Sequence, residues 1–271
     1  EPLTANDDPY RLLDGTADGQ IAVRSNLQPS TDSAWTITVV PAGNESALRQ
    51  RAWVEDNRRA VDSLSKGRLA YAWIPNTSAP GTTSFDRYVF AQQDRQGAVI
   101  DERYNGGGSL DDYMVDYLTR SLRGALTNHI PGGAPAALPQ GVLGPKALIV
   151  NERAGSGGDY FPWAFRQQKA GVIVGTRTWG GLVSAASHYP MVNGLSVTAP
   201  VIRVFDPINN QWIAENEGVP PDIEVIVDEK SAAAGRDPQL ERAVSEVLKA
   251  VDAQGVRRIT PPPMPRPARR R

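Results

Sequence analysis

Short apolar segments alternate with amphipathic ones between residues 69 and 174, and this alternation restricts the possible folds more than any other feature. The apolar segments have the length of strands, whereas the longer segments between them favour helices. Such alternation is typical of an α/β domain in which helices cover a sheet. The expected strands are residues 69–74, 98–103, 147–150 and 172–174, and the expected helices are residues 84–93, 110–122 and 160–170.

Weaker patterns precede this region. Residues 1–42 contain a short helix signal and two alternating segments, 21–24 and 35–40, which are too little to bury a core unaided. We therefore expect the last part of a truncated small domain at residues 1–42. Apolar residues at helical spacing then predict a linking helix over residues 47–64, which opens a main domain at residues 43–256.

The pattern becomes strand-rich after Gly181. Asn193-Gly194 predicts a hairpin turn, and residues 238–251 predict a last helix that packs on the core. We expect a long loop at residues 124–144 and an extended, mobile tail at residues 257–271, which are rich in Pro and Arg. The expected strands of this region are residues 187–192, 195–198, 201–205 and 212–214.

Charge and composition exclude several classes of function. The 271 residues include 29 Lys and Arg against 30 Asp and Glu, and this balance gives no reason to expect nucleic acid or an anionic membrane as partner. No segment approaches the ~18 consecutive apolar residues of a membrane span. Zero cysteines exclude thiol nucleophiles and thiolate metal sites, and two histidines are too few for a His-rich metal site. We expect neither a metal nor an organic cofactor.

The segment KALIVNERAGSGGDYF (146–161) carries the strongest chemical signal. An apolar strand runs into a glycine-rich turn that contains Ser156, and a helix follows at once. A serine in such a turn can present its hydroxyl above the sheet edge, while free amides at the helix start favour a developing oxyanion. The pattern indicates an acyl-transfer nucleophile. The alternative is a glycine-rich turn in which Ser156 only caps the helix.

Two further loops could complete such a site. Gly106, Gly107 and Gly108 follow the strand at 98–103, and their amides could bind a peptide carbonyl or an oxyanion. A phosphate-binding loop competes with this interpretation, although neither GxxxxGK[ST] nor GxGxxG is present. Glu215 and Glu217 lie on a loop after the last expected strand, where a carboxylate could orient a catalytic group or could be solvated surface.

At these residues the sequence resembles the tricorn-type proteases of peptidase family S41, the C-terminal processing serine peptidases. The resemblance covers nearly the whole chain except the Pro/Arg tail. It implies a ClpP/crotonase-like catalytic domain at residues 43–256, preceded by the remnant of a PDZ domain at residues 1–42. The segments that carry the resemblance are LTANDDPYRLLDGTADGQ (3–20), RLAYAWIPN (68–76), ERYNGGGSLDDYMVDYLTR (102–120), NERAGSGGDYF (151–161), VGTRTWGG (174–181) and NEGVPPDIEV (216–225).

The resemblance also implies a role for each candidate residue. Ser156 corresponds to the nucleophile, and the amide of Gly157 corresponds to one oxyanion donor. Gly106, Gly107 and Gly108 correspond to the substrate- and oxyanion-binding glycines, with Gly107 as the expected second donor. Glu215 corresponds to the carboxylate of the charge relay, in preference to Glu217. The expected catalytic residues are therefore Ser156 and Glu215.

The general base is the part of the mechanism that this sequence lacks. The resemblance places a histidine upstream of the PDZ domain, whereas His129 and His188 match no motif of the family and are expected to be loop or surface residues. A serine without its base loses several orders of magnitude in rate. We therefore expect this chain to be the C-terminal fragment of a serine endopeptidase and to be nearly inactive when isolated.

Two other functions remain open at this stage. A non-catalytic peptide-binding or assembly module could use the same fold, because PDZ domains bind peptides by strand addition. A crotonase-like acyl-CoA enzyme would share the oxyanion-hole architecture, although no basic motif for the CoA phosphates is present. For the peptidase, the expected partners are peptide substrates, the upstream half of the same polypeptide and further copies in a hexameric homo-oligomer, in the cytoplasm.

Overall fold

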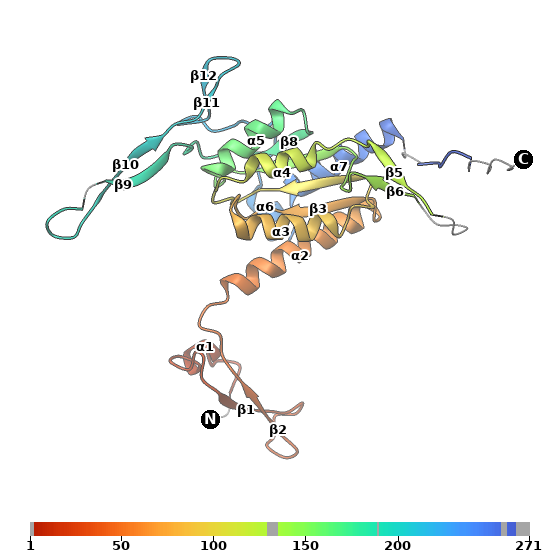
Figure 1. Cartoon of the computed structure of the whole chain (residues 1–271). Coiled ribbons are helices and arrows are strands. Elements are labelled where there is room, and N and C mark those ends of the chain that lie inside the picture. Colours follow the sequence, from red (N-terminus) through yellow and green to blue (C-terminus); the bar gives the residue numbers. More distant parts are fainter. Residues whose placement is uncertain (1–2, 129–134, 189, 256–258, 264–271) are drawn as a thin grey trace, which may run out of the picture. The chain divides into compact units, whose positions relative to one another are not determined.

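The computed structural model describes residues 3–128, 135–188, 190–255 and 259–263 (Figure 1). It divides into two compact units, Glu1–Glu55 and Asp56–Arg271. The division falls inside helix α2 (Ser46–Ser65) and not at residue 42, where we expected the main domain to begin. The bounds of α2 agree with the helix expected over residues 47–64. Most of the tail expected at residues 257–271 lies outside the described residues.

The first unit contains one short helix and one strand pair. Helix α1 (Pro9–Leu12) begins after Asp8, whose side chain accepts a hydrogen bond from the Tyr10 amide at 2.9 Å. Strands β1 (Ile21–Ser25) and β2 (Trp35–Val39) pair antiparallel, as their alternating sequences predicted. None of residues 3–45 is buried, so this segment forms no core of its own. Its origin in a PDZ domain stays a prediction.

A parallel five-stranded sheet organises the second unit, in the order β13-β8-β7-β4-β3. Every residue of β3, β4 and β7 is buried, which confirms the prediction of a sheet covered on both faces. The apolar runs at residues 69–74, 98–103, 147–150 and 172–174 all become strands of this sheet. The strand bounds are β3 (Leu69–Trp73), β4 (Gly97–Asp101), β7 (Lys146–Val150), β8 (Val172–Gly175) and β13 (Ile223–Glu224).

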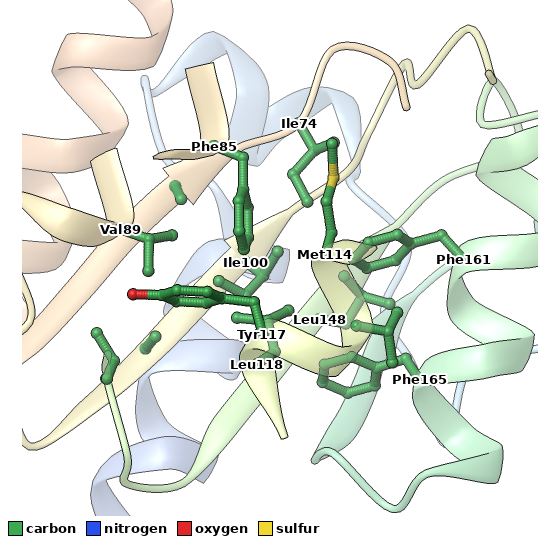
Figure 2. Packing of buried hydrophobic residues seen from close by; sticks show 14 of the residues in the cluster. Ile74, Phe85, Val89, Ile100, Met114, Tyr117, Leu118, Leu148, Phe161 and Phe165 are labelled. Atoms are coloured by element: carbon green, nitrogen blue, oxygen red, sulfur yellow. The ribbon is translucent and has the colours of Figure 1, made fainter. Parts of the chain in front are cut away.

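Helices cover this sheet. Side chains of α3 (Ala79–Phe90), α4 (Asp111–Leu118) and α5 (Gly157–Gln167) pack with one face of the strands in a cluster that includes Phe85, Met114, Leu148, Phe161 and Phe165 (Figure 2). Helix α7 (Pro238–Gln254) packs against β3, β4, β7 and β8 with residues outside this cluster. Alternation along each strand assigns α7 to the opposite face. A short helix, α6 (Glu229–Ala233), precedes α7.

Several elements differ from the sequence-based expectations. Helix α3 begins at Ala79 instead of residue 84, because Asn76 Oδ1 accepts from the amides of Ser78 and Gly81 and Pro80 occupies the first turn. Helix α4 ends at Leu118 instead of residue 122. The segment expected as a long loop contains the antiparallel pair β5 (Gly124–Leu126) and β6 (Ala136–Leu138).

The strand-rich region after Gly181 forms two hairpins. Strands β9 (Ser184–His188) and β10 (Val197–Ile202) pair antiparallel, and β10 takes the place of two shorter expected strands. The Gly194 amide donates to the Met191 carbonyl at 2.9 Å, which confirms a turn at Asn193-Gly194. The second hairpin joins β11 (Phe205–Asp206) to β12 (Gln211–Trp212). Within the described residues, no helix is both long and apolar enough to cross a membrane.

Candidate active site

Ser156 occupies a strained turn between β7 and α5. Its φ is 57°, in the left-handed region that a non-glycine residue adopts only where the surrounding structure enforces it, at a cost of about 1–3 kcal/mol. The Ser156 amide donates to the Gly181 carbonyl at 3.1 Å and to Asp159 Oδ2 at 3.0 Å. The side chain is half-buried. This strand–turn–helix position is the one that the sequence predicted for a nucleophile.

Asp159 connects this turn to the segment TWGG (178–181). Its carboxylate accepts four hydrogen bonds: from Thr178 Oγ1 at 2.5 Å, from the amides of Gly180 and Gly181 at 2.8 and 2.9 Å, and from the Ser156 amide. Burial raises the pKa of Asp159, although these hydrogen bonds act in the opposite direction. One carboxylate therefore fixes both the Ser156 turn and residues 178–181.

The glycine loop approaches Ser156 so closely that a side chain would not fit. A Cβ on Gly107 would lie 2.5 Å from Ser156 Cβ and 2.8 Å from Ser156 Oγ. Residues at the end of β3 hold the loop in place: the Gly106 amide donates to the Pro75 carbonyl, and the Thr77 amide donates to the Gly107 carbonyl, both at 3.0 Å. The structure thus brings the predicted glycines and the predicted nucleophile together.

The amides of this loop differ in their hydrogen-bond partners. The Gly107 N–H, expected as the second oxyanion donor, donates to Asn105 Oδ1 at 2.8 Å. The amides of Gly108 and Gly157 have no hydrogen-bond partner within the described part of the chain. They lie close together, since a Cβ on Gly157 would be 2.8 Å from the Gly108 nitrogen. Two free donors therefore stand beside Ser156.

Glu215 is tied to the same segment as Ser156. Its Oε2 accepts from the Val183 amide at 2.7 Å, and the next amide, that of Asn216, donates to the Gly180 carbonyl at 2.7 Å. Glu215 is half-buried, whereas Glu217 is exposed. Residues 180–183 thus contact Ser156 on one side and the Glu215 loop on the other. Glu215 as the carboxylate of the charge relay stays a prediction, and it is the one of the two acidic side chains that contacts this segment.

No histidine is joined to this site by the described contacts. His188 ends β9, its side chain is exposed, and no hydrogen bond links it to Ser156 or Glu215. His129, the other histidine, lies outside the described residues. The sequence analysis also gave no role to Asp159. A serine followed three residues later by an acidic residue is the pattern of a capping box, and this signal could have identified Asp159.

These features match the parts of a serine-nucleophile acyl-transfer site on an α/β fold. The parts are a serine at a strained strand-to-helix turn, two free amides beside it and a nearby carboxylate. The model of peptidase family S41 matches residues 68–225, which is more than half of the chain and includes every site residue named above. The chain therefore belongs to peptidase family S41.

Individual relatives agree with this assignment. The chain is 36% identical over 267 residues to tricorn protease homolog 1 of Streptomyces coelicolor, and 30% identical over 239 residues to the tricorn protease of Thermoplasma volcanium. These matches cover 98% and 88% of this chain but 24% and 23% of the relatives. A crystal structure of the tricorn protease superposes with a TM-score of 0.81 at 29% identity, covering 89% of this chain and 23% of that one. The chain thus spans about a quarter of the length of these relatives.

Proposed function

We propose that this chain carries the nucleophile and the oxyanion site of a serine endopeptidase that cleaves peptides through an acyl-enzyme on Ser156. The observation that carries the proposal is the strained Ser156 turn with the free amides of Gly157 and Gly108 beside it. Membership of a peptidase family and the similarity to tricorn proteases support it.

In the proposed reaction, Ser156 Oγ attacks the carbonyl carbon of the scissile peptide bond while its proton passes to a general base. The carbonyl oxygen becomes an oxyanion that accepts hydrogen bonds from the amides of Gly157 and Gly108. The C–N bond then breaks, and the leaving amine takes the proton from the base. Water hydrolyses the remaining ester and regenerates Ser156. Removing one oxyanion donor typically costs about 10²- to 10³-fold in rate.

We further propose that the base is a histidine from another part of the polypeptide, which Glu215 helps to position as part of the charge relay. The resemblance to tricorn-type proteases and the exposed position of His188 support this proposal. The same resemblance supports residues 1–42 as part of a PDZ domain and a hexameric homo-oligomer. The cysteine-free composition agrees with a cytoplasmic location.

Fluorophosphonate labelling tests the nucleophile, because the probe reacts with activated serines. The source organism's lysate is labelled, the labelled protein is sized, and the modified peptide is sequenced. A label on Ser156 that disappears in a Ser156→Ala variant and persists in a control variant, Ser184→Ala at an exposed serine of β9, is the expected result. A protein that is present but unlabelled would favour the non-catalytic peptide-binding or assembly module instead.

A further inference from the structure

Two buried polar groups lie behind the oxyanion site. They are the hydroxyl of Thr77 and the carboxyl of Asp111. They meet at Gly157: a Cβ there would clash with Thr77 Oγ1 and would lie 3.0 Å from Asp111 Oδ1 and 2.8 Å from the Gly108 nitrogen. A carboxyl group therefore stands next to the two amides that we assign to the oxyanion.

The charge of that carboxyl group is decisive for an oxyanion. Asp111 is 4% exposed and forms no ion pair within the described part of the chain. The titratable groups that interact with it are acids or a phenol: Asp112 on its own helix, Glu102 after β4 and Tyr160 on α5. An ionised Asp111 would thus repel a developing oxyanion with no neighbouring cation to offset it.

Burial and these neighbours favour the neutral acid. Desolvation raises the pKa of Asp111 to about 7, with a smaller contribution from the charge of Asp112, while the neighbouring Thr77 hydroxyl acts in the opposite direction. Desolvation and the charges of Asp111 and Asp159 also raise the pKa of Glu102 well above its ordinary value. The Asp111 carboxyl behind the amides is therefore mostly protonated below pH 7 and becomes negative as the pH rises through about 7.

We propose that Asp111 is a positioning residue that acts in its protonated form. No negative charge then lies behind the amides of Gly108 and Gly157 when the oxyanion develops. The proposal rests on the proposed function of Ser156. It follows that the reaction rate falls at alkaline pH, and that this fall follows the ionisation of Asp111. A histidine base, which must be neutral to accept a proton, gives a separate ascending limb at acid pH.

The pH profile of fluorophosphonate labelling at Ser156 tests the proposal in the full-length protein, with wild type, Asp111→Asn and the control Asp112→Asn. Asp112 is the matched control because it is the same residue type one position away but is exposed. Wild type should slow by about tenfold or more between pH 6.5 and 8.5, as expected for a charge a few ångströms from the oxyanion. Asp112→Asn should keep this decline, displaced to lower pH because the charge of Asp112 contributes to the raised pKa of Asp111. Asp111→Asn should keep its rate over that range. An Asp111→Asn profile that declines like wild type overturns the proposal while the labelled Ser156 upholds the proposed function.

Amide chemical shifts provide a test that needs no activity. In a ¹⁵N-glycine-labelled chain, the signals of Gly108 and Gly157 should titrate with a midpoint near pH 7 in wild type and should be constant over that range in Asp111→Asn. Signals that do not move in wild type refute the proposal, even if Ser156 is never labelled or the variant fails to fold. A midpoint shared by wild type and Asp111→Asn refutes it as well.

Discussion

Replacing Asp159 with asparagine tests whether one carboxylate holds the active-site segments together. Oδ1 accepts from Thr178 Oγ1 and the Gly180 amide, and Oδ2 accepts from the amides of Gly181 and Ser156. An amide nitrogen cannot accept, so asparagine loses the Gly181 and Ser156 hydrogen bonds if Nδ2 replaces Oδ2, or the Gly180 hydrogen bond if Nδ2 replaces Oδ1, where the Thr178 hydroxyl can rotate to accept. The remaining hydrogen bonds lose their charged acceptor in either orientation. At about 1.5–3 kcal/mol for each hydrogen bond to a charged group, the direct loss is about 3–6 kcal/mol.

Part of this loss is regained because the variant no longer buries a charge. Burial raises the pKa of Asp159, so the carboxylate pays a desolvation cost that the neutral amide avoids. We therefore expect the free energy of unfolding to fall by about 2–4 kcal/mol, which is within the range measured when buried hydrogen-bond networks are broken. The rate of Ser156 labelling should fall as well, because the Ser156 turn loses its anchor.

Urea unfolding followed by tryptophan fluorescence measures the first effect, and fluorophosphonate labelling under conditions where both proteins are folded measures the second. Asp116→Asn is the matched control: Asp116 is exposed and accepts one hydrogen bond, from Gln168 Nε2 at 2.8 Å. It should change the free energy of unfolding by less than about 0.5 kcal/mol. An Asp159→Asn protein within about 1 kcal/mol of wild type, labelled at the wild-type rate, would refute the anchoring role.

Three other variants test separate parts of the structure. Gly107→Ala should reduce Ser156 labelling by more than about 100-fold, because its Cβ would collide with Ser156; Gly194→Ala, with a similar positive φ but open space around it, should leave the rate unchanged. Lys146→Met should raise the free energy of unfolding at pH 7 by about 1–3 kcal/mol, because burial lowers the pKa of Lys146 to about 8 and the folded protein must bury a charged ammonium below that pH. Urea unfolding at pH 7 and at pH 10.5 should show a smaller stability difference between the variant and wild type at the higher pH. Asp111→Asn should unfold at higher urea than wild type at pH 8.5 but not at pH 3.5. The raised pKa of Asp111 in the folded state stabilises the wild type below the pKa of the unfolded state, and this stabilisation is lost as the pH rises through about 7. Equal differences in urea midpoint at both pH values would contradict this linkage.

The sheet could be predicted from the sequence because its strands are continuous apolar runs. Residues 69–74 and 147–150 allow few alternatives, since strands buried on both faces have no polar position to place in water. Strand β13 escaped prediction, because two residues carry no periodicity and the strand exists only through its pairing with β8. The start of α3 was misplaced for a similar reason: Asn76 makes its contacts with the helix start from outside the amphipathic pattern.

The candidate site, like the sheet, could be predicted only where the signal lies in a short stretch of sequence. Ser156 and the glycines were identified from local sequence, because a serine between glycines at a strand end is a short-range signal. The choice between Gly107 and Gly108 as donor was not local, since it depends on which amide the Asn105 side chain occupies. Thr77 and Asp111 gave no signal at all, because they meet Gly157 only after three distant segments fold together.

Parallel topology explains why those segments meet. Strands β3, β4, β7 and β8 all end at the same edge of the sheet, and the segments that follow them carry Thr77, the glycine loop, Ser156 and TWGG. Each segment is held by its neighbours: the Gly155 amide donates to the Asn105 carbonyl at 3.1 Å, and the Trp179 amide donates to the Ala154 carbonyl at 2.8 Å. The strain of the Ser156 turn can persist only because these contacts restrain it from both sides. A substitution in any one segment should therefore change the reactivity of Ser156 even where it touches no substrate, and this is the effect that we expect of Asp159→Asn and Asp111→Asn.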